Sequence, residues 1–180
     1  MKTIAVASIA SVQTGPFGSQ LHQEDYVAIG TPIVTVEHLG KRRFTTQNLP
    51  SVSDSDKERL HKYVLKTGDI VFSRVGSVDR CSFVSKNENG WMFSGRCLCI
   101  RPCSTIDAKY LYYYFCLDKT KKFLRNIAVG ATMPSINTKL ISEVPIALLS
   151  KDVQTAIAGV LSAIDDKIEI NEDINHNLAA

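Results

Sequence analysis

The 180-residue sequence has no apolar run close to the roughly 20 residues that a membrane-spanning helix needs. It also lacks both glycine patterns that bind nucleotide phosphates, Gly-x-x-x-x-Gly-Lys-Ser/Thr and Gly-x-Gly-x-x-Gly. The short apolar stretch after Met1 is interrupted by the polar residues Ser8, Ser11 and Gln13, which favours a first strand over an export signal. We therefore expect a cytoplasmic protein without membrane contact.

Cysteine and histidine are present, but not in metal-binding patterns. The five cysteines are an odd set and the four histidines are scattered. Cys97 and Cys99 lie two apart in an expected strand, so buried thiols are strongly favoured over a zinc site. Asp165, Asp166 and Lys167 fit a solvated helix face better than a nuclease site, because nuclease carboxylates must converge on a metal. We expect no catalytic residue, no metal and no cofactor.

Charge is divided unevenly along the chain. Residues 1–150 hold 19 basic and 12 acidic side chains, a net charge of +7, whereas residues 151–180 hold two basic and six acidic ones, a net charge of −4. A basic body with an acidic tail suits a domain that approaches a polyanion. Ordinary surface charge is an equally good explanation, so charge alone does not decide for nucleic acid.

Hydrophobic patterning predicts an α+β class, with short strands first and helices later. The Asn89-Gly90 step predicts a hairpin turn between the third and fourth strands. Strands are expected at residues 33–36, 70–74, 81–85 and 92–100, and helices at residues 107–126 and 139–142.

The last 30 residues predict a long helix, and we divide the chain into a domain at 1–150 and a helix at 151–180. Apolar and asparagine residues recur there at alternating spacings of three and four, which is typical of a coiled-coil seam. A helix of this length is expected to project and to need a partner helix; the alternative is a helix that packs back on its own domain. The seam comprises Ile157, Leu161, Ile164, Ile168, Asn171, Asn175 and Leu178.

Four loops carry groups suited to DNA. In the first loop, residues 14–20, two glycines leave backbone N–H groups open. The second, residues 41–43, consists of three adjacent cations, and in the third, residues 73–80, two arginines flank a glycine turn. The fourth loop, residues 130–137, consists mainly of small residues, two of them with hydroxyl groups, although Asn137 also suits the N-cap of a short helix. Ordinary turns and solvated surface are the alternatives. The candidate DNA-contacting residues are Gly15, Phe17, Gly18, Ser19, Gln20, Lys41, Arg42, Arg43, Arg74, Ser77, Arg80, Thr132, Ser135 and Asn137.

The order of these segments resembles the target-recognition domain of type I restriction-modification specificity subunits. The resemblance covers nearly the whole chain. Its most specific parts are Gly68-Asp69-Ile70 and a helix pattern similar to the family's spacer helix, Gln154-x-x-Ile157-Ala158-x-x-Leu161-Ser162-x-x-Asp165-Asp166-Lys167-Ile168.

In that family, two recognition domains separated by two antiparallel helices usually each read half of a split DNA site. The resemblance implies a non-catalytic subunit that binds double-stranded DNA and docks modification (methyltransferase) subunits and a restriction subunit. One domain and one helix depart from the pattern. Two explanations remain open. The chain is a fragment, or it is a half-subunit that forms a homodimer through its helix and reads a palindromic split site.

The rival hypothesis is an interaction protein or decoy that acts through its C-terminal helix and does not bind DNA. A small nuclease or methyltransferase is disfavoured because no converging catalytic groups are found.

Overall fold

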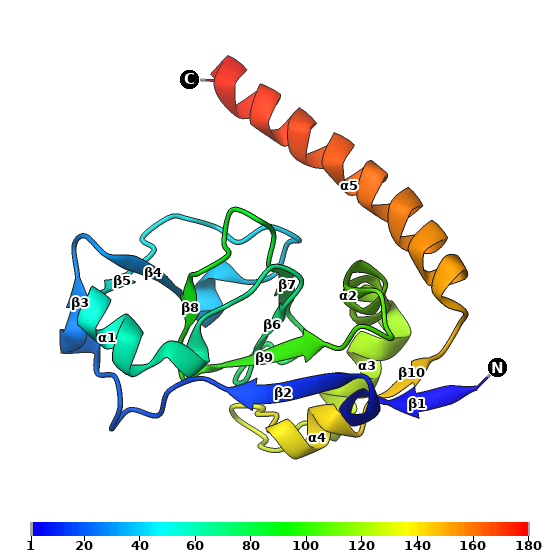
Figure 1. The fold of residues 1–180 in the computed structure, drawn as a ribbon, viewed down its shortest axis with the longest axis horizontal. Helices are drawn as coiled ribbons and strands as arrows, with labels where there is room; N and C mark the ends of the chain where they lie inside the picture. The colour runs from blue at the N-terminus through cyan, green and yellow to red at the C-terminus, as the bar shows by residue number, and fades with distance from the viewer. Residues whose placement is uncertain (1, 180) are drawn as a thin grey trace.

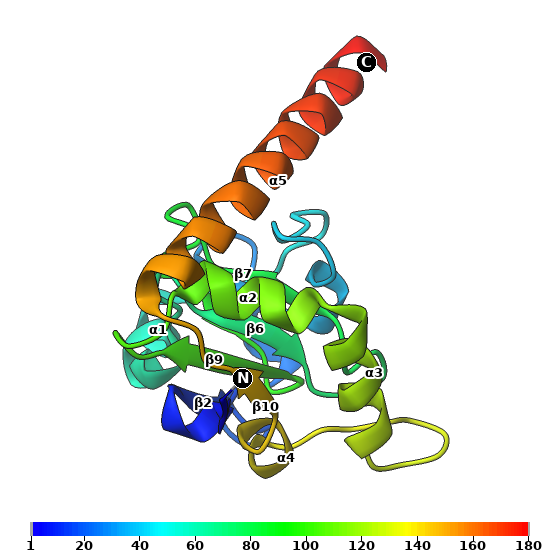
Figure 2. The same ribbon diagram turned by 90° about the vertical axis from the view of Figure 1, so that its right-hand side faces the viewer.

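The computed structural model describes residues 2–179, which form an α+β body (residues 2–150) and one long C-terminal helix, α5 (Lys151–Ala179) (Figure 1). The predicted α+β class is confirmed, as is the long C-terminal helix. Figure 2 shows that the last turns of α5 extend beyond the body. No helix within residues 2–179 combines the length and the apolar character that crossing a bilayer requires.

The body is built on a four-stranded antiparallel sheet. Its order is β2 (Ala10–Thr14), β9 (Cys97–Pro102), β6 (Ile70–Ser73) and β7 (Cys81–Phe83). Side chains of a strand alternate between two faces, so β6 and β9 bury one set of apolar residues on each side. This sheet therefore separates two hydrophobic cores.

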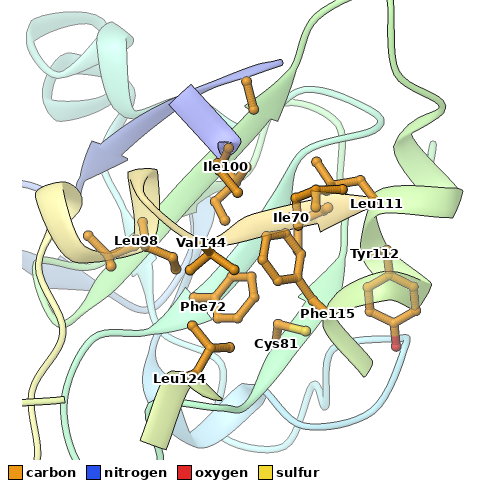
Figure 3. Packing of buried hydrophobic residues seen from close by; sticks show 14 of the residues in the cluster. Ile70, Phe72, Cys81, Leu98, Ile100, Leu111, Tyr112, Phe115, Leu124 and Val144 are labelled. Carbon is orange, nitrogen blue, oxygen red and sulfur yellow. The ribbon is translucent and has the colours of Figure 1, made fainter. Parts of the chain in front are cut away.

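Helices cover the first face of this sheet. Phe72 of β6 meets Phe115 of α2 (Ala108–Cys116) edge-on, with ring centroids 4.8 Å apart, and Leu124 comes from α3 (Asp118–Ile127) (Figure 3). The same core includes Ile141 of α4 (Thr138–Ser142). The two-stranded sheet of β1 (Thr3–Ala5) and β10 (Pro145–Ala147) joins the ends of the body beside it.

The second face packs against a smaller sheet with the order β3-β5-β4-β8. Cys97 and Cys99 point into this second core, where burial raises the pKa of the Cys97 thiol to about 12. Within residues 2–179, no three His, Cys, Asp or Glu side chains converge as metal ligands. The remaining elements are β3 (Tyr26–Val27), β4 (Thr31–Val34), β5 (Ser51–Val52), β8 (Met92–Phe93), α1 (Asp54–Arg59) and the 3-10 turns η1 (Val6–Ser8), η2 (Gln23–Asp25), η3 (Val36–His38) and η4 (His61–Tyr63).

Three predictions about secondary structure were wrong. The turn at Gly90 does not join a hairpin: β7 pairs with β6, whereas β8 runs parallel to β4 in the other sheet. Residues 92–100 form two strands, because the chain turns at Ser94 and passes from one sheet to the other. The helix predicted at 107–126 is two helices, broken at Leu117, whose backbone is extended.

The Gly68-Asp69-Ile70 motif has a structural role. Gly68 adopts a positive φ of 94°, which glycine tolerates, and this turn leads directly into β6. The buried Asp69 carboxylate accepts two hydrogen bonds from the Arg101 guanidinium, at 2.8 and 2.6 Å, and a third from the Lys66 backbone N–H. The motif therefore fixes the start of β6 against β9.

Candidate functional site

The body carries an open cleft of about 740 Å³. Its walls come from the loop after β2, from η3 and from the turn between β8 and β9. Phe17, Gly18 and Arg74, three of the predicted contact residues, line it. The structure thus gathers residues from three distant parts of the sequence around one open surface.

Close backbone contact holds the cleft wall together. A Cβ on Gly15 would lie 2.1 Å from the Ser94 carbonyl oxygen, and a Cβ on Gly95 would lie 2.1 Å from that of Pro16. Only glycine allows the two loops to approach so closely. We call this close contact at Gly15 and Gly95 the glycine crossing. It fixes the base of the loop after β2.

Beyond the glycine crossing, this loop exposes Phe17, Gly18 and Ser19. The Gln20 side-chain oxygen accepts hydrogen bonds from the Phe17 backbone N–H at 3.4 Å and from the Tyr63 hydroxyl at 2.8 Å. Gln20 thus holds the loop in place, and the three residues before it are open to a partner.

Two arginines contribute positive charge to the cleft. The Arg74 backbone N–H donates to the Arg96 carbonyl oxygen at 2.9 Å, so the two residues are neighbours. The Arg74 guanidinium makes only long hydrogen bonds, 3.3 Å to the Thr14 hydroxyl and 3.4 Å to the Gly95 carbonyl oxygen, and Arg96 is exposed. Guanidinium groups in this setting suit phosphates and the acceptor edge of guanine.

The loop before α4 lies beside the Arg74 turn. Gly76 donates its backbone N–H to the Pro134 carbonyl oxygen at 2.8 Å, and Ile136 donates to that of Arg74 at 2.9 Å. Two of the four predicted loops are therefore paired through their backbones. Ser77 and Thr132 are exposed on this surface.

Two predicted contact residues of the loop before α4 also have structural partners. The Ser135 hydroxyl donates to the Val129 carbonyl oxygen at 3.1 Å. The Asn137 side chain accepts the Leu140 backbone N–H at 2.9 Å and caps α4, which is the alternative weighed for it from the sequence.

Four predicted contact residues lie elsewhere. Lys41, Arg42 and Arg43 form ion pairs with acidic residues of α5. Arg80 donates from its guanidinium to the Leu39 carbonyl oxygen and supports the same loop. The structure does not bring these four side chains to the cleft.

Several other residues that line the cleft were not identified from the sequence. Arg96, His22, Gln23 and Asn48 line the cleft and offer polar groups to a partner. Arg96 lies between Gly95 and the first residue of β9, so it is an arginine near a glycine at a strand end, as Arg74 is. The other three carry no local signal, because they come together only through the packing of loops.

The long helix α5 presents two different faces. Gln154, Ala158 and Ser162 are buried against the body. Ile164 and Ile168 of the predicted seam are 53% and 49% exposed, and Leu161 and Leu178 are also exposed. Ile157, the first residue of the seam, packs partly buried against the first core, as Ala158 does. The rest of the seam, from Leu161 onward, is exposed in the part of the chain that the structure describes.

The interpretation of Asp165, Asp166 and Lys167 as a solvated charge run is correct for Asp166 and Lys167, which are exposed, but incomplete, because Asp165 is half-buried and both carboxylates face the body. Asp165 accepts a hydrogen bond from the Tyr113 hydroxyl at 2.9 Å, and Asp166 pairs with Arg42 at 2.5 Å. Arg42 lowers the pKa of the Asp166 carboxyl. These carboxylates lie opposite basic side chains of the body.

Comparisons with known sequences agree with this architecture. The family model described as the type I restriction modification DNA specificity domain matches residues 1–180. A putative type I restriction enzyme MjaX specificity subunit from Methanocaldococcus jannaschii is 32% identical over 152 residues, which cover 81% of this chain and 36% of that protein. The HindI specificity subunit from Haemophilus influenzae is 27% identical over 121 residues, 65% of this chain and 26% of that protein.

Among solved structures, the S subunit of a type I restriction-modification system from M. genitalium has the same fold, with a TM-score of 0.68 at 17% identity. The match covers 93% of this chain and 40% of that one, so this chain spans less than half the length of these relatives. With a family model that matches the whole sequence, the chain belongs to the family of type I restriction-modification DNA specificity domains.

Proposed function

We propose that this chain reads the sequence of double-stranded DNA through the cleft and the loops beside it. The observation that carries this proposal is the cleft, where Arg74 and Arg96 lie between two exposed loops on a body of net charge +7. Loops fixed on a rigid sheet commonly present binding residues. The site would recognise one half of a split DNA sequence.

The proposed mechanism divides contacts into two kinds. Arg74 and Arg96 would contact phosphates or the O6 and N7 acceptors of guanine. Exposed polar groups at Gln23, Ser77 and Thr132, with the open backbone N–H groups near Gly18, would add base and phosphate contacts. The chain would supply specificity only, while modification and restriction subunits docked to it would carry out methylation and cleavage.

The apolar seam of α5 supports a second part of the proposal, the pairing of two copies of this chain. A long apolar stripe exposed on a helix is stable in water chiefly when another helix covers it. Asn171 and Asn175 within the stripe would favour one register over others. A two-fold pair would present two clefts to a palindromic split site.

A second candidate function rests on the same seam. An interaction protein or decoy would use α5 to engage a specificity or modification subunit, and its body would not contact DNA. Salt-dependent DNA binding by the purified chain separates the two hypotheses, because contacts with phosphates release counterions.

The test is DNA binding by the wild-type chain and by the double variant Arg74→Gln/Arg96→Gln, measured by fluorescence anisotropy across a range of salt concentrations. We expect the slope of log K against log[salt] to fall by about 2, about 1 for each lost phosphate contact. The matched control is Lys119→Gln/Lys122→Gln, which removes the same charge from exposed positions on α3. An equal effect of both pairs would contradict a role for the cleft.

Contact of Lys41, Arg42 and Arg43 with DNA stays a prediction. Reversing the charge of Arg42 and Arg43 to Glu tests it: lower affinity and a weaker salt dependence would support contact. Unchanged binding would remove the loop from the site. Co-sedimentation with a cognate modification subunit tests the docking half of the proposal.

A further inference from the structure

Three consecutive cations connect the body to α5. This basic triplet (Lys41, Arg42 and Arg43) lies between β4 and β5. It faces five carboxylates on one side of the helix, the acidic face, and each cation of the triplet forms at least one ion pair there. The acidic face comprises Asp165, Asp166, Glu169, Glu172 and Asp173.

Arg42 is the centre of this contact. Its guanidinium donates to Glu169 at 2.7 and 2.6 Å, to Asp166 at 2.5 Å and to the Ser162 carbonyl oxygen at 3.3 Å. The Arg42 and Glu169 side chains are only 15% and 10% exposed. Arg43 also reaches Glu169 at 2.6 Å. A planar guanidinium that binds two carboxylates and a backbone carbonyl in this way fixes direction as well as distance.

The basic triplet is itself attached firmly to the central sheet. The Ser82 hydroxyl of β7 donates to the Lys41 carbonyl oxygen at 2.6 Å, and the Phe83 backbone N–H donates to that of Arg42 at 2.9 Å. Gly40 takes a positive φ of 127° immediately before the triplet, in close contact with the Arg80 guanidinium. The basic triplet therefore fixes the position of α5 relative to the central sheet.

A second attachment holds the start of α5. The Gln154 side chain accepts the Asp107 backbone N–H at 2.7 Å and donates to the Leu149 carbonyl oxygen at 2.9 Å. Gln154 and Glu169 lie 15 residues apart, which is about 22 Å along a helix. These two attachments lie near the two ends of the contact between α5 and the body, with Ala158, Ser162 and the Tyr113–Asp165 hydrogen bond between them. The contact at Glu169 lies farthest from the start of the helix and therefore has the longest lever arm on the angle of the helix axis.

We propose that the basic triplet sets the angle between the body and α5, and thereby the spacing of the two half-sites that a pair of chains reads. This inference rests on the proposed function. A tilt of about 10° acting over a helix of about 40 Å displaces its end by about 7 Å, which is about two base pairs at roughly 3.4 Å each. A small change in the angle of the helix axis would therefore shift the distance between the two half-sites by a whole base pair or more.

The test uses the full-length chain. A half-site is first selected from random duplexes with the wild-type protein. Affinity is then measured for a single half-site and for inverted pairs of half-sites whose spacing changes by one base pair at a time. The variants are Arg42→Gln/Arg43→Gln, the charge swap Arg42→Glu/Glu169→Arg, and the control Lys119→Gln/Lys122→Gln, which removes the same charge as the first variant.

We expect the wild-type chain and the control to prefer one spacing by tenfold or more. For Arg42→Gln/Arg43→Gln, the affinities across spacings, each divided by the same variant's affinity for the single half-site, should agree within about threefold, since about two base pairs of freedom is expected. The charge swap should recover part of the preference. An undiminished spacing preference in Arg42→Gln/Arg43→Gln would overturn the inference, whereas failure of the wild type to bind any half-site would overturn the proposed function.

Discussion

Pairing of two chains through the α5 seam leads to a quantitative prediction for Ile164. Complete burial of an isoleucine side chain is worth about 1.5–3 kcal/mol. Ile164 is 53% exposed in the single chain, so about half of that value remains to be gained on association. Because a two-fold pair contains the residue twice, Ile164→Ala should weaken the pair by about 1.5–3 kcal/mol, a 10- to 150-fold higher Kd.

The assay is sedimentation equilibrium over a wide concentration range. Alanine keeps helix propensity high, so α5 should remain helical by circular dichroism. Ile170 provides a matched control, because it is 54% exposed on the same helix but lies outside the seam. Ile170→Ala should leave the Kd almost unchanged. An equal loss in both variants, or a wild-type chain that is monomeric at hundreds of micromolar, would refute the assignment of the seam.

Three further predictions concern the body. Phe72→Ala should lower the free energy of unfolding by about 3–5 kcal/mol in urea titrations, because it removes a fully buried ring; a loss below 1 kcal/mol would contradict the packing described. Asp69→Ala should cost about 2–4 kcal/mol, since it leaves the partly buried Arg101 without its partner, and Asp69→Asn should cost less. Cys116 should be alkylated faster than Cys97 in mass-spectrometric assays. Hydrogen bonds from Cys81 and Tyr112 lower the pKa of Cys116 to about 7, so its rate should rise with pH through that value, and equal rates for the two thiols would count against this.

The sequence was most informative where structure depends on local pattern. The strand at 70–73 follows a glycine turn and is a short continuous apolar run that is buried on both faces, and the helix from Lys151 has a regular apolar repeat. Asn137 was correctly weighed as a helix cap. These features are encoded within a few residues, so the structure could be expected from them.

Sequence reasoning failed where distant segments decide the outcome. The Asn89-Gly90 step favours a hairpin, but Met92 pairs with Ile33 of another sheet, a contact between residues 59 positions apart. The ion pairs of Arg42 with a helix more than 120 residues later could not be expected from its neighbours in the sequence, and its contact with DNA stays a prediction. The polar residues of the cleft were missed for the same reason.

The glycine crossing has a consequence for how a new specificity arises. The wall of the cleft is fixed by backbone atoms at Gly15 and Gly95, and the exposed residues 17–19 make little contribution to either hydrophobic core. Substitutions at these tips would change the chemistry offered to a partner while the frame beneath stays folded. On the proposed function, point mutations at these exposed positions would give the chain a different DNA target without a change of fold.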